Sequence, residues 1–313
     1  MVTAIGMIKN SADIIESYIR CNSNVVDNFV LLDNMSSDRT VEILHCLMKE
    51  GYQIEVLADK EIAHNQADKL MNLLYYCQKK YDSDFYIPLD DDEVIFAPDV
   101  NFSGTHIRNY LKANAGTRDL FHFNWRNYFP AAEDDPGEVC VPKRQTLYFD
   151  ESMQYGMKCI VSRGLLADDS FILWQGSHSG DGELITERRM FNELIVAHYP
   201  CRSLEQVISK VVVGWLANLA IKDKPDHWAK HWQKMYDMVR QGIRDERLMN
   251  LLAIQYLGTD VTEADMKITK GRIPLDEKYF EMKYTEPKEF DSLHNIIMLA
   301  EKMALELAAK TEE

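Results

Sequence analysis

The sequence predicts an α/β protein built on a doubly wound, mostly parallel sheet, followed by a C-terminal helical extension. Short apolar runs alternate with helix-spaced segments over residues 2–89, as expected of consecutive β-α-β units. Polar clusters follow the second and fourth runs, at the edge where an open parallel sheet binds its ligands. With 313 residues, 46% hydrophobic and 27% charged, the chain is long and apolar enough for a large ordered core.

Each element of the N-terminal half has a local signal. Residues 2–8 are almost continuously apolar, which suits a buried strand, and residues 12–21 then space apolar side chains as a helix does. The polar stretch DNMSSDRT contains Ser37 and Asp38, either of which can cap a helix that ends at Gly51. The remaining predictions are strands at 29–32, 53–57 and 84–89 and a helix at 66–81.

The second half is predicted less regularly. Four β-like pieces, at 120–125, 157–163, 171–176 and 192–199, are read as the rest of the sheet together with acceptor-side loops. The chain then becomes helical, at 203–221, 228–243 and 290–310, so we expect one unit over residues 1–200 and a helical region over 201–313 packed on it. On the last helix a one-sided stripe is expected to pack against the domain; it comprises Leu293, Ile296, Ile297, Ala300, Ala304 and Leu307.

Charge and targeting signals narrow the function classes. The net charge is −15, with 50 acidic against 35 basic residues, so nothing attracts the chain generally to nucleic acid or anionic lipid. No targeting segment and no run of eighteen apolar residues is present, which predicts a cytoplasmic protein without a transmembrane segment and leaves peripheral membrane association open. The six cysteines form no C-x-x-C pair and are expected as buried thiols.

Four consecutive acids, Asp90 to Glu93, follow the apolar run FYIPL. Such crowded like charges are costly unless a cation lies among them. Asp90 and Asp92, spaced i, i+2, can project to one side of an extended segment, and hard oxygen ligands favour Mg²⁺ or Mn²⁺ with positions left for phosphate. The sequence therefore indicates a metal and diphosphate site, with a solvated acidic turn as the alternative.

At this point the chain resembles a known family. The stretches IGMIKNSADIIESYI, VLLDNMSSDRTVEIL and LDDDEV, in this order, resemble the motifs of family 2 glycosyltransferases of the GT-A fold, and HYPCRSLEQVISKVVVGWLA resembles a later segment in one branch of it. The resemblance implies that residues 1–200 form a nucleotide-sugar-binding and catalytic domain. It also implies a metal-dependent, inverting transfer, with Mn²⁺ or Mg²⁺, from a nucleotide-diphosphate donor, a UDP-sugar first, to a glycan or lipid-linked acceptor.

The resemblance also assigns roles to single residues. Asp33 matches the acid that contacts the nucleotide base, and Asn10 lies in the matching turn after the first strand. Asp90 and Asp92 match the two acids of the DxD motif: Asp92 would be the direct metal ligand, and Asp90 would reach the ribose or a metal-bound water. Asp91, also counted among the nucleotide-sugar-binding residues, is expected to point to the other face. Ser11, Met35 and Arg39 stand where the family has Glu, Gly and Gly, so contacts on the nucleotide side can differ.

A histidine often completes such a metal shell, and two compete here. His198 ends the last predicted strand and is preferred over His178, which lies in a glycine-flanked loop. Arg202 and Lys210 follow His198 and could meet the diphosphate oxygens. Each of these side chains also has a purely structural alternative: His178 and His198 as core histidines, and Arg202 and Lys210 as residues of a solvated helix face. His227 and His231 have the spacing of a zinc pair but no evident third ligand.

An inverting transfer needs a general base that takes the proton of the acceptor hydroxyl. Asp181 and Glu183, in the loop GSHSGDGE, are preferred over four other acids. Trp125, Tyr128 and Trp174 are expected either to stack on sugar or to lie in the core. The acids set aside are Asp150, Glu151, Asp168 and Asp169.

Three rivals remain beside the glycosyltransferase. A sugar nucleotidyltransferase would favour a glycine-rich basic loop after its first strand, where this chain has KNSADII. A glycoside hydrolase would need two carboxylates facing each other across a cleft. A non-catalytic glycan-binding or scaffold protein on a degenerate transferase fold is the third, and the intact Asp90 and Asp92 argue against it. Nothing in the sequence predicts the donor sugar, the acceptor, the linkage or the oligomeric state.

Overall fold

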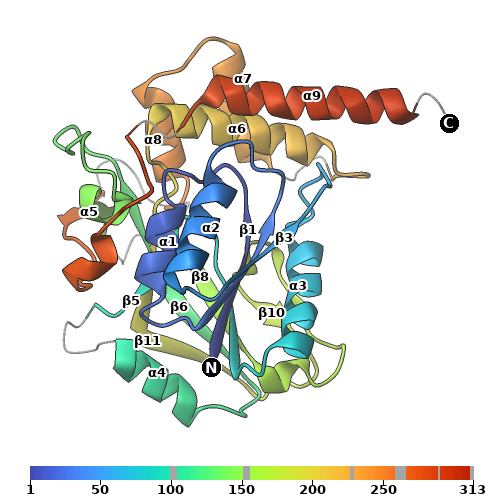
Figure 1. Ribbon diagram of the computed structural model, residues 1–313, viewed down its shortest axis with the longest axis vertical. Helices are drawn as coiled ribbons and strands as arrows, with labels where there is room; N and C mark the ends of the chain where they lie inside the picture. Colours follow the sequence, from blue (N-terminus) through green and yellow to red (C-terminus); the bar gives the residue numbers. More distant parts are fainter. Residues whose placement is uncertain (99–103, 151–155, 226–228, 258–265, 288–289, 311–313) are drawn as a thin grey trace.

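The computed structural model describes residues 1–313 except 99–103, 151–155, 226–228, 258–265, 288–289 and 311–313. Its centre is a ten-stranded sheet in the order β12-β7-β6-β8-β4-β1-β2-β3, with β11 beside β6 and β5 beside β11. Helices cover both faces of this sheet, and a layer of C-terminal helices crosses one end of it (Figure 1). The predicted α/β class with a helical extension is confirmed.

The first half of the sheet is parallel and doubly wound. β1 pairs with β2 and β4, and β2 pairs with β3, all in parallel. Alternate residues of β1 face opposite layers: Ala4 and Ile8 pack with α1 and α2, whereas Ile5 packs with Leu70 and Leu73 of α3. The elements are β1 Val2–Ile8, α1 Ile15–Asn22, β2 Asn28–Asp33, α2 Thr40–Glu50, β3 Ile54–Ala58, α3 Gln66–Lys80 and β4 Phe85–Pro88.

The second half of the sheet is mixed. β8 lies antiparallel between β4 and β6, and β11 runs parallel to β6 but antiparallel to β5. Of the predicted strand 171–176 only Ile172–Leu173 (β9) is a strand, and it forms a separate hairpin with β10, Gly180–Asp181. The sequence missed β5, because its four buried residues EVIF show no alternation. The other strands are β5 Glu93–Phe96, β6 Asp119–Phe129, β7 Leu147–Phe149, β8 Met157–Ser162, β11 Glu187–His198 and β12 Ile268–Lys270.

The C-terminal part of the chain packs on the sheet in two places. α6 contacts α7, α8 and α9 and crosses the end of the sheet where β1 finishes (Figure 1). The segment around Ile273 and Phe280 returns to α1 and shares a core with β5 and β11. The remaining helices are α4 Gly104–Ala113, α5 Val141–Arg144, η2 Arg163–Leu166, η3 Gln175–Ser177, α6 Leu204–Leu219, α7 Lys230–Arg240, α8 Glu246–Ile254, η5 Glu277–Phe280 and α9 Ser292–Lys310.

The face predicted for the last helix is only partly right. Ile296 of the predicted stripe packs against the core, but Leu293 and Leu307 are 65% and 67% exposed, and the side of α9 that packs on α6 also carries Asn295 and Leu299. The Asn295 side chain exchanges hydrogen bonds with hydroxyls of α6 and of the loop before α2, so polar pairing helps to choose the contact face. Over the described part of the chain, no helix combines the length and apolar character that crossing a membrane requires.

Candidate active site

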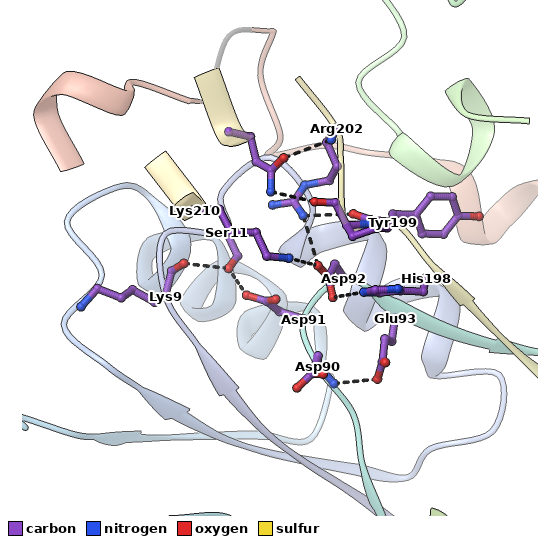
Figure 2. Close-up of polar contacts among 12 residues, drawn as sticks. Lys9, Ser11, Asp90, Asp91, Asp92, Glu93, His198, Tyr199, Arg202 and Lys210 are labelled. Atoms are coloured by element: carbon purple, nitrogen blue, oxygen red, sulfur yellow. Dashed lines mark hydrogen bonds and ion pairs between the residues drawn. The ribbon is translucent and has the colours of Figure 1, made fainter. Parts of the chain in front are cut away.

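Asp90, Asp91 and Asp92 lie in the turn between β4 and β5, and Glu93 is the first residue of β5. The Glu93 amide donates to the Asp90 carbonyl over 3.1 Å, and the Asp90 amide donates to the Glu93 carboxylate over 2.9 Å. We call residues 90–93 the acid turn. The strand alternation expected to turn Asp91 away does not apply here, and the side chains of Asp90, Asp91 and Asp92 diverge around one cavity (Figure 2).

This cavity, of 1710 Å³, occupies the end of the sheet where β1 and β4 finish. Its size exceeds that of a drug-sized ligand pocket and suits a donor and an acceptor together. Most of the predicted site residues line it. In sequence order, the lining residues used below are Lys9, Asn10, Asn34, Gln66, Asp90, Asp91, Asp92, Trp125, Trp174, Gln175, His178, Asp181, Arg188, His198, Arg202 and Lys210.

Asp92 is the most deeply buried acid of the cavity wall, at 2% exposure. Its Oδ2 accepts a hydrogen bond from Lys210 Nζ at 2.7 Å and lies 3.6 Å from the Arg202 guanidinium (Figure 2). Burial opposes the ionisation of Asp92, but the charges of Lys210 and other neighbours, Arg202 among them, together outweigh it and hold the pKa of Asp92 well below its ordinary value. Asp92 is therefore a carboxylate at neutral pH.

His198 faces the other oxygen of Asp92. Its Nδ1 donates to Asn127 Oδ1 at 2.7 Å, which leaves the lone pair on Nε2, and Nε2 lies 3.6 Å from Asp92 Oδ1. Burial lowers the pKa of His198 to about 4, so the ring is neutral at pH 7. Two acceptors thus face each other with no proton between them, an arrangement that a cation stabilises.

The donor set of Asp92 and His198 fits a divalent cation. An imidazole whose other nitrogen is fixed by a side-chain oxygen is a common metal ligand, and a carboxylate beside it supplies a hard oxygen. Within the ranges that the structure describes, no group of three or more His, Cys, Asp or Glu side chains is placed to hold a metal ion. Two protein ligands leave the remaining positions to phosphate oxygens and water, as Mg²⁺ sites on nucleotides usually do.

His178 is not part of this pair. The indole of Trp125 stacks on His198, with ring centres 4.8 Å apart, and meets His178 edge-on at 5.0 Å. His178 Nδ1 donates to the Met157 carbonyl at 2.9 Å, and burial lowers the pKa of this ring. The structure thus brings His198 to Asp92 and leaves His178 on the far side of Trp125.

Asp90 is held by a lysine that the sequence analysis overlooked. Lys158 on β8 is fully buried and donates to Asp90 Oδ2 at 2.7 Å, with Glu93 Oε2 3.3 Å away. Burial alone would lower the pKa of Lys158, but the two carboxylates raise it, so the ammonium is charged. Glu93 in turn accepts the indole N–H of Trp125 at 3.0 Å. A lysine inside the apolar run MKCIV was the available signal for a buried acidic partner.

Asp91 points toward the end of β1, where Ser11 donates a short hydrogen bond to its Oδ2 (Figure 2). Burial and the negative charge of Asp92 raise its pKa to about 7. Beside it, Asn10 has a φ of 52° and its Oδ1 accepts the Ser37 amide at 2.8 Å, which joins the loop after β1 to the loop after β2. The serine that replaces the family's glutamate therefore has a defined partner.

Asp33 caps a turn, and its neighbour Asn34 lines the cavity. The Asp33 carboxylate accepts the Ser36 amide at 3.2 Å. Asn34 accepts a hydrogen bond from Lys9 Nζ at 2.9 Å, and burial lowers the pKa of Lys9 to about 8. Lys9 and Asn34 are polar side chains of this wall that the sequence analysis did not select, although both lie within its quoted motifs.

Arg202 and Lys210 differ in how many protein groups they contact. Arg202 makes a two-pronged ion pair with Asp13, at 2.6 and 3.0 Å, and donates to the Tyr199 carbonyl at 3.2 Å, so it mainly fixes the loop after β11. Lys210 contacts Asp92 through one flexible side chain that is 29% exposed. Of the two cations, Lys210 is better placed to turn toward a ligand.

Of the two predicted general bases, one lines the cavity and the other does not. Asp181 lines the cavity, where its oxygens accept from Trp174 Nε1 at 2.8 Å and Arg188 at 2.7 Å. Glu183 does not line the cavity, and its amide donates to Ser170 at 3.1 Å. Among the predicted aromatic platforms, Tyr128 is a core residue at 1% exposure and Trp125 is a 7% exposed wall. Glu151 and His227 lie outside the described residues.

Comparisons with known proteins were made for the whole chain. No protein-family model and no curated protein sequence matches it. Among solved structures it is similar to TarS residues 1–349 from S. aureus, at 11% identity over 74% of this chain and 68% of that one, with a TM-score of 0.40. It is also similar to the mannosyltransferase PcManGT from Pyrobaculum calidifontis, at 13% identity over 81% of this chain and 79% of that one, with a TM-score of 0.37. A third similar structure is glucosyl-3-phosphoglycerate synthase from Mycobacterium tuberculosis, at 15% identity over 72% of this chain and 81% of that one, with a TM-score of 0.34. Likeness at this level does not by itself assign an activity to this chain.

Proposed function

We propose that this protein is a metal-dependent, inverting glycosyltransferase of the GT-A type that uses a nucleotide-diphosphate sugar, a UDP-sugar first. One observation carries the proposal: Asp92 Oδ1 and a neutral His198 Nε2 face each other across 3.6 Å inside a 1710 Å³ cavity. The carboxylate alone would indicate only an acidic turn. Paired with an imidazole whose tautomer Asn127 fixes, it is a site prepared for a cation.

The chain's own residues would divide the work as follows. Asp92 and His198 would hold Mn²⁺ or Mg²⁺, which when bound neutralises the charge that develops on the diphosphate leaving group. Once a cation neutralises the Asp92 carboxylate, Lys210 would leave Asp92 and contact a phosphate oxygen. Lys158 pairs with Asp90, which lines the cavity and would bind a ribose hydroxyl or a water there. Asp33, Asn10 and Asp91 would form the nucleotide side.

The general base stays a prediction, and the structure favours Asp181 over Glu183 for it, since Asp181 lies in the cavity wall. Each of its oxygens accepts one side-chain hydrogen bond, from Trp174 and from Arg188, and a carboxylate oxygen has a second lone pair with which it could take a proton. The acceptor of the transfer is proposed to be a glycan or a lipid-linked sugar.

The proposal is tested by donor hydrolysis and by metal binding. Wild-type protein should release sugar from at least one UDP- or GDP-sugar when Mn²⁺ is present, and NMR of a transfer product should show inversion at the anomeric carbon. The His198→Ala variant should lose Mn²⁺ affinity and activity together, whereas His178→Ala should keep its Mn²⁺ affinity. Release of pyrophosphate from a nucleoside triphosphate and a sugar phosphate would instead support the nucleotidyltransferase, and Mn²⁺ affinity lost only in His178→Ala would reverse the histidine assignment.

A further inference from the structure

The side chain of Trp174 lies in the cavity wall with 48% of its surface exposed. Trp125 and Trp215 are each only 7% exposed. Leaving an indole half open forgoes a large part of the free energy that its burial would give, because indole is among the largest apolar surfaces a side chain has. An exposed indole inside a ligand cavity is therefore a candidate contact surface for a ligand.

The polar edge of this indole is already satisfied. Trp174 Nε1 donates to Asp181 Oδ2 at 2.8 Å, and Asp181 Oδ1 accepts from Arg188 at 2.7 Å. Arg188 also donates to Ser179 Oγ at 2.8 Å, and that hydroxyl lies 2.9 Å from His122 Nε2 on β6. The chain of contacts ties the indole to the central sheet and leaves its ring as the part available for contact.

The backbone around Trp174 is equally constrained. The β9–β10 hairpin, residues 172–181, closes through the Trp174 amide on the Ser179 carbonyl at 2.8 Å and the Ser177 amide on the Trp174 carbonyl at 2.9 Å. Its turn passes through Gly176 at φ 75°, where a Cβ would lie 2.6 Å from His178 Nε2. The position of the ring is thus fixed before any ligand arrives, which lowers the entropic cost of binding.

The hairpin is also connected to the acid turn. Gln175 Nε2 donates to Gln66 Oε1 at 3.2 Å, and Gln66 Nε2 donates to Asp90 Oδ1 at 3.1 Å. A molecule stacked on Trp174 would therefore lie in the same cavity as Asp90, next to polar groups that can bind hydroxyls. These groups are the side chains of Gln175, His178 and Arg188.

We propose that Trp174 is the stacking platform of an acceptor subsite that binds an uncharged sugar ring. The inference rests on the proposed function and names the part of the cavity that the acceptor occupies. A pyranose has an apolar C–H face and a rim of hydroxyls, and this wall offers the matching pair, a fixed apolar ring bordered by hydrogen-bonding groups. A lipid chain would gain nothing from that polar border, and the polar wall with Lys9 and Asn34, close to β1, is kept for the nucleotide.

The test uses a glycan array, with fluorescently labelled full-length protein applied in the presence of Mn²⁺ and UDP or GDP. The wild-type protein should bind a subset of neutral glycans. Trp174→Ala should weaken that binding about tenfold or more, as the loss of a central tryptophan does at other binding sites, and Trp174→Phe should restore part of it. Ile172→Ala is the matched control, because Ile172 is 62% exposed on the same hairpin and does not line the cavity.

Nucleotide affinity, measured by calorimetry with UDP and GDP, separates this inference from the proposed function. Unchanged nucleotide affinity in Trp174→Ala together with weakened glycan binding supports the acceptor subsite. Nucleotide affinity lost in that variant would assign the ring to the donor and overturn the inference. Glycan binding that is absent in wild type, or equal in Trp174→Ala, would also overturn it, whereas failure of the proposed function would appear as wild-type protein that neither binds nor hydrolyses a nucleotide sugar.

Discussion

Glu16 on α1 and Asp92 in the acid turn are both buried carboxylates beside an arginine, and both have a pKa below the ordinary value. Glu16 is saturated with donors: the amides of Lys283, Tyr284 and Thr285 lie 2.8, 2.9 and 2.8 Å from its oxygens, and Arg20 Nε lies at 2.8 Å. Among the described residues, Asp92 has a hydrogen-bond donor on one oxygen only, Oδ2. Its other oxygen faces the lone pair of His198.

The difference separates a structural carboxylate from a functional one. Fixed backbone amides cannot be exchanged for a ligand, so Glu16 has a structural role: it fastens the segment 283–285 to α1 and pairs with Arg20. The partners of Asp92 are a flexible lysine and a neutral imidazole, which can both accommodate an arriving cation. Burial and a low pKa are common to both sites, and only the identity of the partners distinguishes them.

The largest effect is expected from Asp92→Asn. The substitution keeps the shape of the side chain but removes the charge that binds the cation, so turnover should fall about a hundredfold or more. Donor hydrolysis at saturating Mn²⁺ measures the loss, and circular dichroism checks the fold. Activity within a few-fold of wild type would mean that Asp92 is structural like Glu16.

Glu16→Gln should have the opposite profile. The substitution removes the negative charge of residue 16 that pairs with Arg20, and it presents an amide group to three backbone N–H donors. Together these changes should lower the free energy of unfolding by about 3 kcal/mol. Urea denaturation measures the change, and Mn²⁺ affinity of the folded fraction should be unchanged. A control is Glu50→Gln, which also touches Arg20 but is partly exposed, and we expect a smaller loss there.

Glu16→Gln should also change how the stability of the protein depends on pH. Burial alone would raise the pKa of Glu16, but the amides of residues 283–285 and Arg20 lower it below 4.5 in the folded protein. Its contribution to stability is therefore complete above the unfolded value and is lost as the pH falls through the folded value. The stability gap between wild type and Glu16→Gln should shrink in acid below that value. A gap that widens on acidification would contradict the assignment.

Asn127→Ala tests the pairing of His198 with Asp92 Oδ1 through the residue that orients the imidazole. Without the Asn127 oxygen the tautomer of His198 is no longer fixed, and the affinity for Mn²⁺ should fall about 10- to 100-fold, as for other groups that orient metal ligands. Calorimetric titration of Mn²⁺ gives the number. His178→Ala is the matched control, since His178 lies across Trp125 from the pair, and equal losses in the two variants would refute the proposed shell.

The smallest effect is expected from Asp33→Ala. In the proposed function Asp33 contacts the base of the donor, and such a contact, far from the reacting bond, would be made equally in the ground and transition states. The KM for the donor should rise about tenfold with kcat changed by less than about threefold. Steady-state kinetics at varied donor concentration separates the two constants, and a collapse of kcat alone would show that Asp33 has a different role.

The sequence by itself determined the parallel half of the sheet and the place of the site. The period of its apolar runs, the capped turn after β2 and the acids after β4 are local features, and the structure reproduces them to within a few residues. The position of His198 at the end of the last predicted strand also made it the preferred partner of Asp92 over His178, and the structure places His198 Nε2 3.6 Å from Asp92 Oδ1.

Tertiary structure alone decided which partners complete each acid. Lys158 reaches Asp90 over 68 positions of the chain, and residues 283–285 reach Glu16 over about 268. The packing face of α9 also depends on distant segments, through the polar contacts of Asn295 and the burial of Leu299 against Ile62 and Val213. The physical reason is that periodicity and turn chemistry act between residues a few positions apart. A buried charge is neutralised by whichever donor the completed fold brings within 3 Å of it, and a single sequence does not encode that proximity locally.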